Sequence, residues 1–231
     1  MRDAAGTRPR GRRSAAAALL LVVAVTACDE HDGDEGPADV VSAAVRVEAT
    51  GCRARPSVGA GSFLGDELVL TVAHVVAGSD DVRITLSDGS SSTASVVAID
   101  RDKDLAVLAV EAEASPLPVG RARPGDRGDF VVWRDEAPVT NPFEIITYVD
   151  INASNIDHDG SGLRKGFQID AQVDNGDSGS VLVHRGEAVG VVFARSTGDG
   201  GRAWATDIRE AVPLLDEAAD RAAVDVGRCV G

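Results

Sequence analysis

A glycine-rich hexapeptide constrains this chain most: Asn175-Gly176-Asp177-Ser178-Gly179-Ser180, which is preceded in the first half by Thr71-Val72-Ala73-His74. A serine hydroxyl is a poor nucleophile unless an imidazole takes its proton and a carboxylate fixes the tautomer of that imidazole. The glycines beside Ser178 permit a tight bend in which backbone N–H groups face a developing oxyanion. The two segments therefore supply a candidate nucleophile, Ser178, and a candidate base, His74.

A third segment, Asp102-Lys103-Asp104-Leu105-Ala106-Val107-Leu108, lies between them and offers the carboxylate. Together the three segments resemble the trypsin-like serine proteases of the chymotrypsin fold, and most closely their bacterial HtrA-like branch. The order histidine, aspartate, serine is that of the chymotrypsin type, whereas α/β-hydrolases and subtilisins use other orders. A Gly-x-Ser-x-Gly elbow would also need glycine where this chain has Ser180.

The resemblance implies a role for each residue of the site. Ser178 would attack a peptide carbonyl, His74 would carry the proton, and the backbone N–H groups of Gly176 and Ser178 would hold the oxyanion. Asp104 would orient His74, because the HtrA-like pattern Asp-Leu-Ala-Val-Leu places the carboxylate directly before the leucine. Asp100 and Asp102 are the alternatives. The partner would be a polypeptide substrate, and no metal or organic cofactor is needed.

Asp177 occupies the position at which trypsin-like zymogens pair with a newly freed N-terminus. HtrA-like enzymes need no such cut, so we expect Asp177 to hydrogen-bond locally and no activation cleavage to occur.

The resemblance also locates a specificity pocket. Its base would be Gln172, six residues before the serine, and its edge would be Phe193, Ala194 and Arg195. A neutral amide gives no counter-charge to a buried cation, so cleavage is not expected to follow Lys or Arg.

Short Val-rich runs separated by Gly and Asp turns predict an all-β protein. About six strands precede Pro116, enough to close a small barrel. The pattern then repeats after a linker at Arg121 to Gly128. The prediction is two antiparallel six-stranded barrels, about 40–120 and 128–208, in a domain spanning 40–231. A C-terminal α-helix is expected at about 208–222, capped by Thr206 or Asp207. Its apolar face would comprise Ile208, Val212, Leu215, Ala218 and Ala222. No PDZ-like segment follows, in contrast to full HtrA proteins, so PDZ-controlled activation is not expected.

Residues 1–27 have the form of an export signal, with five arginines before an apolar stretch too short to span a bilayer comfortably. The stretch ends in Val25-Thr26-Ala27-Cys28, which resembles a bacterial lipobox and predicts lipidation of Cys28. The protein would then be lipid-anchored on the outer face of the cell membrane. An ordinary secretory signal, giving a secreted protein, is the alternative.

The acidic segment 28–39 that follows predicts a disordered tether. Removal of residues 1–27 takes away five arginines and one aspartate, so the formal charge changes from −14 to −18. So acidic a body repels nucleic acid, which excludes DNA and RNA as expected partners.

Two cysteines, Cys52 and Cys229, remain in the exported body. Outside the cytoplasm a disulfide between them is expected, and two unrelated free thiols are the alternative.

The sequence thus predicts an exported serine endopeptidase. Two other functions stay open: a catalytically silent trypsin-like fold that serves as a binding or sensing lipoprotein, and an esterase on the same fold. The sequence does not reveal the oligomeric state.

Overall fold

A computed structural model describes residues 37–112, 114–196 and 201–229. Residues 37–43 form one short helix before the first strand. The predicted signal segment, the lipidation site Cys28 and the first part of the predicted tether lie outside the described residues. All of the described residues belong to one compact unit, Gly33–Gly231. In this part of the chain no helix combines the length and apolar character that a bilayer crossing requires.

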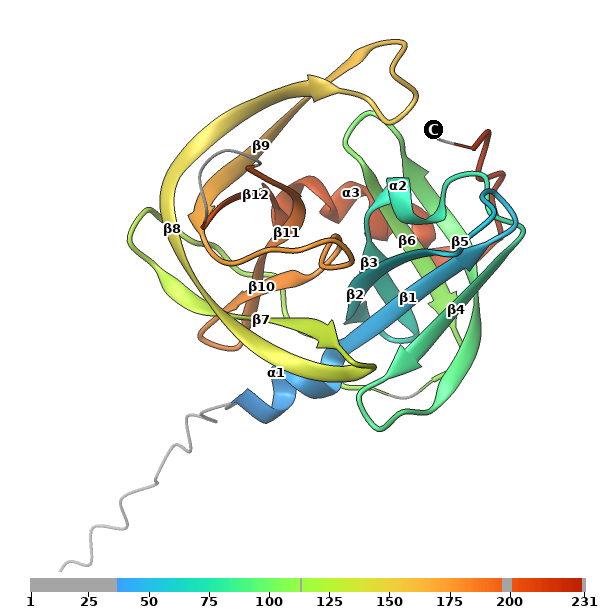
Figure 1. Cartoon of the computed structure of the whole chain (residues 1–231), viewed down its shortest axis with the longest axis horizontal. Coiled ribbons are helices and arrows are strands. Elements are labelled where there is room, and N and C mark those ends of the chain that lie inside the picture. Colours follow the sequence, from blue (N-terminus) through green and yellow to red (C-terminus); the bar gives the residue numbers. More distant parts are fainter. Residues whose placement is uncertain (1–36, 113, 197–200, 230–231) are drawn as a thin grey trace, which may run out of the picture. The chain divides into compact units, whose positions relative to one another are not determined.

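The first six strands form a closed antiparallel barrel, barrel one, as predicted (Figure 1). They are β1 (Ala44–Thr50), β2 (Ser57–Gly65), β3 (Leu68–Thr71), β4 (Asp81–Leu86), β5 (Ser91–Asp100) and β6 (Leu105–Val110), in the order β1-β2-β3-β6-β5-β4. In β1 the alternation expected from the sequence is present, since Val45 and Val47 are buried while Arg46 and Glu48 are half-buried. The β2–β3 hairpin leads directly to the segment that carries His74.

The next six strands form barrel two, which confirms the predicted architecture. They are β7 (Arg127–Arg134), β8 (Ala137–Ser154), β9 (Ser161–Asp170), β10 (Val181–His184), β11 (Glu187–Arg195) and β12 (Arg202–Asp207), in the order β10-β11-β12-β9-β8-β7. A single pair, Val183 with Asp129, closes the ring between β10 and β7. The long curved strand β8 (yellow in Figure 1) pairs with β7 along its first half and with β9 along its second.

Three strands of barrel two are apolar on both faces. Phe130, Leu182 and Val189 belong to the interior of barrel two. Their chain neighbours Val131, Val181 and Ala188 instead join the core of barrel one. Strands β7, β10 and β11 therefore form the wall between the two barrels, because period-2 alternation gives each strand one residue set per face.

The described chain begins with α1 (Pro37–Ala43), so ordered structure starts three residues before the predicted boundary at 40. The C-terminal helical region is present but interrupted. It consists of the 3-10 turn η1 (Ile208–Glu210), α3 (Val212–Glu217) and the 3-10 turn η2 (Ala218–Asp220). Asp207 caps η1 by accepting the Arg209 N–H at 3.0 Å.

The predicted apolar face of this helical region was partly wrong. Leu214 is buried, whereas Val212 is 37% exposed. Pro213 lies at the start of α3, where its missing N–H breaks the helical ladder and changes which residues face inward.

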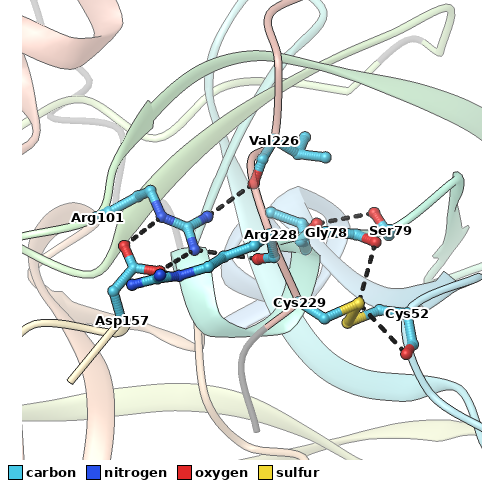
Figure 2. The surroundings of a disulfide bond; sticks show 9 residues. Cys52, Gly78, Ser79, Arg101, Asp157, Val226, Arg228 and Cys229 are labelled. Atoms are coloured by element: carbon cyan, nitrogen blue, oxygen red, sulfur yellow. Dashed lines mark hydrogen bonds and ion pairs between the residues drawn. A yellow bond between two sulfur atoms is a disulfide. The ribbon is translucent and has the colours of Figure 1, made fainter. Parts of the chain in front are cut away.

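After η2 the chain returns to barrel one as an extended segment, residues 221–229. Val224 N donates to Val96 O at 2.9 Å, and Val226 O accepts from Gly78 N at 3.2 Å. Arg101 donates to Val226 O and pairs with Asp157, as Figure 2 shows. A disulfide joins Cys229 to Cys52, with 5.4 Å between their Cα atoms.

Candidate active site

His74 is held by a one-turn helix, α2 (Ala73–Val76), that follows β3. Ala73, Val75 and Val76 are buried, and His74 is the residue of this helix that reaches the surface, with 34% of its side chain exposed. Three apolar anchors thus fix the helix, and the imidazole is left accessible to a substrate.

Both oxygens of Asp104 accept hydrogen bonds from His74. Oδ1 accepts the backbone N–H of His74 at 2.8 Å, and Oδ2 lies 2.8 Å from the ring Nδ1. Asp104 is 10% exposed at its side chain and adopts a left-handed φ of +57° directly before β6. Since Nδ1 faces the carboxylate, Nε2 is the nitrogen left to accept a proton.

The structure brings Asp104, rather than the two alternatives, to His74. Asp100 Oδ1 accepts the N–H groups of Asp102 and Lys103 at 3.1 and 2.8 Å. Asp102 Oδ1 accepts from the Asn155 amide at 3.1 Å. Both carboxylates thus shape the loop in front of Asp104.

Ser178 lies in a turn between β9 and β10 that docks on barrel one. Its carbonyl accepts the N–H of Ala60 at 2.8 Å. A Cβ on Gly59 would lie 2.8 Å from that carbonyl and 2.7 Å from Val75 Cγ2. The backbone of Gly59 therefore lies between the serine loop and the helix of His74, in close contact with both. The serine and histidine loops therefore meet at the same corner. Among the described residues, Ser178 Oγ makes no hydrogen bond to His74.

The N–H groups of the serine loop fall into two sets. Those of Asp177, Gly179 and Ser180 donate to backbone carbonyls at 3.2, 2.8 and 3.0 Å. Within the described ranges, neither the N–H of Gly176 nor that of Ser178 has a protein acceptor. Gly176 also has a φ of +96°, which a residue with a side chain rarely adopts. Two donors on one bend are the arrangement that an oxyanion hole requires.

Asp177 is completely buried and paired with Arg134, the last residue of β7. The guanidinium donates Nη1 to Oδ1 at 2.6 Å and Nη2 to Oδ2 at 2.8 Å, and Asp174 N also donates to Oδ2 at 2.8 Å. The hydrogen bonds that Arg134 donates to Asp177 raise the pKa of Arg134 above its ordinary value. The bond from Asp174 N is the local hydrogen bond expected at Asp177. Arg134 was not predicted, because an arginine at a strand end is typical of a solvated position.

Of the residues predicted for specificity, Gln172 and Arg195 are exposed, and Phe193 and Ala194 are half-buried. Gln172 is exposed, and Asn141 donates to its carbonyl at 3.2 Å. On β11, the pairing with β10 ends at Val191, while the pairing with β12 continues to Arg195. Phe193 stands in a bulge there and Ala194 is half-buried. The outer part of β11 thus has a strand edge on which an extended peptide can pair.

The described ranges contain no group of three or more His, Cys, Asp or Glu side chains placed to hold a metal ion. The chemistry available at this corner is that of a nucleophile, a base, a carboxylate and backbone donors.

Comparisons with known proteins identify the family of this chain. Residues 59–191 match the model of the trypsin-like peptidase domain. A probable periplasmic serine endoprotease, DegP-like, of Halomonas elongata is 30% identical over 75% of this chain, and an HtrA-like serine protease of Staphylococcus aureus is 36% identical over 57%. The chain spans only 37% and 19% of the length of these two curated relatives.

Among solved structures, the active form of the Rv3671c protease from M. tuberculosis superposes with a TM-score of 0.75 at 28% identity. That similarity covers 86% of this chain and 91% of the other. The HtrA-type protease AlgW with a tripeptide has a TM-score of 0.68 over 81% of this chain and 63% of its own, and at 24% identity it supports the fold alone.

Proposed function

This chain belongs to the family of trypsin-like peptidase domains, and from that premise we propose that it is a serine endopeptidase. The observation that carries the proposal is that Asp104 binds both the backbone N–H and the ring Nδ1 of His74. This contact lies at the corner where the Ser178 loop docks on barrel one. Oδ2 holds a proton on Nδ1 and Oδ1 fixes the backbone of His74, which leaves Nε2 to act as the base, and this favours an active enzyme over a silent fold.

The proposed reaction follows the acyl-enzyme route. Ser178 Oγ attacks the scissile carbonyl while its proton passes to Nε2 of His74, and the oxyanion is held by the N–H groups of Gly176 and Ser178. His74 then gives that proton to the leaving amine as the C–N bond breaks. Water, deprotonated by His74 in the same way, hydrolyses the acyl-enzyme and frees Ser178. Asp104 stabilises the imidazolium of His74 in both the acylation and the deacylation step.

The ion pair between Arg134 and Asp177 supports activity without a proteolytic cut. It supplies, from within the chain, a cation that neutralises the buried carboxylate beside Ser178. The neutral Gln172 and the Phe193–Arg195 edge support cleavage after neutral side chains rather than after Lys or Arg.

The proposal includes export. Similarity to a relative named periplasmic supports a place outside the cytoplasm, where the Cys52–Cys229 disulfide would be stable. We propose that Cys28 is lipidated and anchors the protein to the outer face of the membrane. Replacing Cys28 with Ser would then release the protein from the membrane fraction, and unchanged fractionation would refute the anchor.

The test of function compares the wild type with Ser178→Ala and with the matched control Ser115→Ala, which changes an exposed loop serine. A fluorophosphonate probe should label the wild type and Ser115→Ala but not Ser178→Ala. A peptide library should be cleaved by the same two proteins, and residual turnover of Ser178→Ala should be at most about a thousandth. Labelling without cleavage of peptides but with cleavage of esters would identify an esterase. Absence of both labelling and cleavage would favour the silent binding fold.

A further inference from the structure

Arg164 is a buried cation that the proposed mechanism does not use. It lies on β9, in the part of the β8–β9 hairpin that extends past the pairing of β9 with β12, which ends at Gly166. Only 4% of the residue is exposed, and its Nε is buried with no hydrogen-bond partner in the described part of the chain. Burial of a charged group is costly, so its position calls for an explanation.

The hairpin brings Arg164 to the loop that carries Asp104. Gly162, on the same inward face of β9, makes this approach feasible, since a Cβ there would lie 1.9 Å from the carbonyl of Asp102. Arg164 Nη1 then donates to the carbonyl of Lys103. That carbonyl belongs to the peptide group directly before Asp104, so its position helps to fix the left-handed φ of +57° at Asp104.

The other side of the guanidinium covers the candidate substrate edge. Arg164 Cζ lies 4.0 Å from the centroid of the Phe193 ring, within the range of a cation–π contact. A single side chain therefore contacts both the loop of the base-orienting carboxylate and the strand on which a peptide would pair.

From these contacts we infer that Arg164 is a positioning residue for Asp104, which holds its loop in the reactive conformation and couples it to Phe193. This inference rests on the proposed peptidase function. Three carboxylates face Arg164: Asp100 at the end of β5, Asp104 directly before β6, and Glu210 on η1. Glu210 is also paired with Lys103 at 2.9 Å. Burial lowers the pKa of Arg164, and these carboxylates oppose that effect.

The test uses Arg164→Met, with Arg101→Gln as the matched control. Arg101 also bridges the Asp104 loop to the hairpin, through Asp157, but it does not contact the Lys103 carbonyl. In Arg164→Met we expect kcat on a cleaved peptide to fall about 10–100-fold, with a smaller change in KM, because the carboxylate is misplaced rather than removed. The NMR chemical shift of the His74 Nδ1–H proton, which is hydrogen-bonded to Asp104, should move toward the value of a free imidazole in Arg164→Met and stay in place in Arg101→Gln.

Other outcomes of these experiments would contradict the inference about Arg164. A folded Arg164→Met with wild-type kcat and an unmoved Nδ1–H resonance would overturn the inference, as would a loss of kcat equal to that of Arg101→Gln with the resonance unmoved. Should Arg164→Met not fold, Arg164→Lys keeps the charge but loses the forked donor, and wild-type kcat in this variant would be the contrary result.

The Nδ1–H resonance also separates this inference from the proposed function, because its measurement requires no turnover. It should differ between Arg164→Met and the wild type even if neither protein cleaves peptides. An unchanged resonance would count against Arg164 alone, whereas a wild type without hydrolysis would count against the peptidase.

Discussion

Arg134 holds Asp177 by two parallel hydrogen bonds of 2.6 and 2.8 Å, and Asp177 is the residue directly before Ser178. The pair joins the end of β7 to the serine loop, so the bend that presents the Gly176 and Ser178 N–H groups depends on a contact within barrel two. Asp177 is fully buried, whereas the side chain of Arg134 is 36% exposed.

Arg134→Met should therefore weaken both the fold and the active corner. It leaves a buried carboxylate without its cation, at a cost of about 1–3 kcal/mol after allowance for the water that reaches Arg134. Fluorophosphonate labelling of Ser178 should slow at least about tenfold. The control is Arg127→Gln on the same strand, whose pair with Glu144 is exposed. Equal labelling rates in the two variants would refute the role of Arg134.

Gly179→Ala should disrupt the docking of the serine loop. A Cβ at Gly179 would lie 2.0 Å from the carbonyl of Ala60 and 2.7 Å from Thr71 Oγ1. Gly125 has a similar φ, +91° against +92°, but a Cβ there would have no neighbour within 4 Å, so Gly125→Ala isolates the backbone effect. We expect about 1–2 kcal/mol of destabilisation for Gly125→Ala and about 1–3 kcal/mol more for Gly179→Ala. Chemical denaturation measures both, and equal values would contradict the steric explanation.

Acid should weaken the contact between the β8–β9 hairpin and Arg101. The hydrogen bonds from Arg101 hold the pKa of Asp157 well below its ordinary value of 3.8, with a further contribution from Arg228. A carboxyl whose pKa is lower in the folded state stabilises the fold above the unfolded value and loses that effect as the pH falls through the folded value. The stability difference between wild type and Asp157→Asn should thus be full above pH 3.8 and shrink below it. A stability difference that stays constant as the pH falls below 3.8 would contradict this role of Asp157.

Reduction of the Cys52–Cys229 disulfide should lower Tm, because the bridge closes a loop across 177 positions of sequence. Loss of such a bridge costs about 2–5 kcal/mol. Cys229→Ser should have the Tm of the reduced wild type and should not respond to reductant. Since residues 221–229 also bond to Gly78 and Arg101, some peptidase activity should survive. An oxidised and a reduced wild type with the same Tm would show that the bridge adds no stability.

The sequence predicted the parts of this molecule that depend on local pattern. Alternation in segments such as Val45–Val47, and turns such as that between β2 and β3, are encoded within a few residues, so both barrels were predictable. His74 and Asp104 were found because their neighbours match a family pattern, and the structure brings the two together.

The two arginines at the site were not predictable in the same way. Arg164 lies in Ser161-Gly162-Leu163-Arg164-Lys165, where an arginine is typical of a solvated strand face. Its burial depends on a hairpin that reaches the other barrel, and local sequence carries no signal of that approach except Gly162. The C-terminal helix expected at about 208–222 is present, but it is divided into η1, α3 and η2, a division that helical spacing alone does not reveal.

Because β7, β10 and β11 contribute side chains to the cores of both barrels, neither barrel can be separated from the other without exposing apolar surface. A truncated barrel two would expose Val131, Val181 and Ala188 to water along three strands. Such an apolar surface associates with copies of itself, so neither half is expected to persist as a soluble fragment. The halves are therefore not modules that evolution or engineering can exchange singly, and melting of either one removes the serine from its base in the same event.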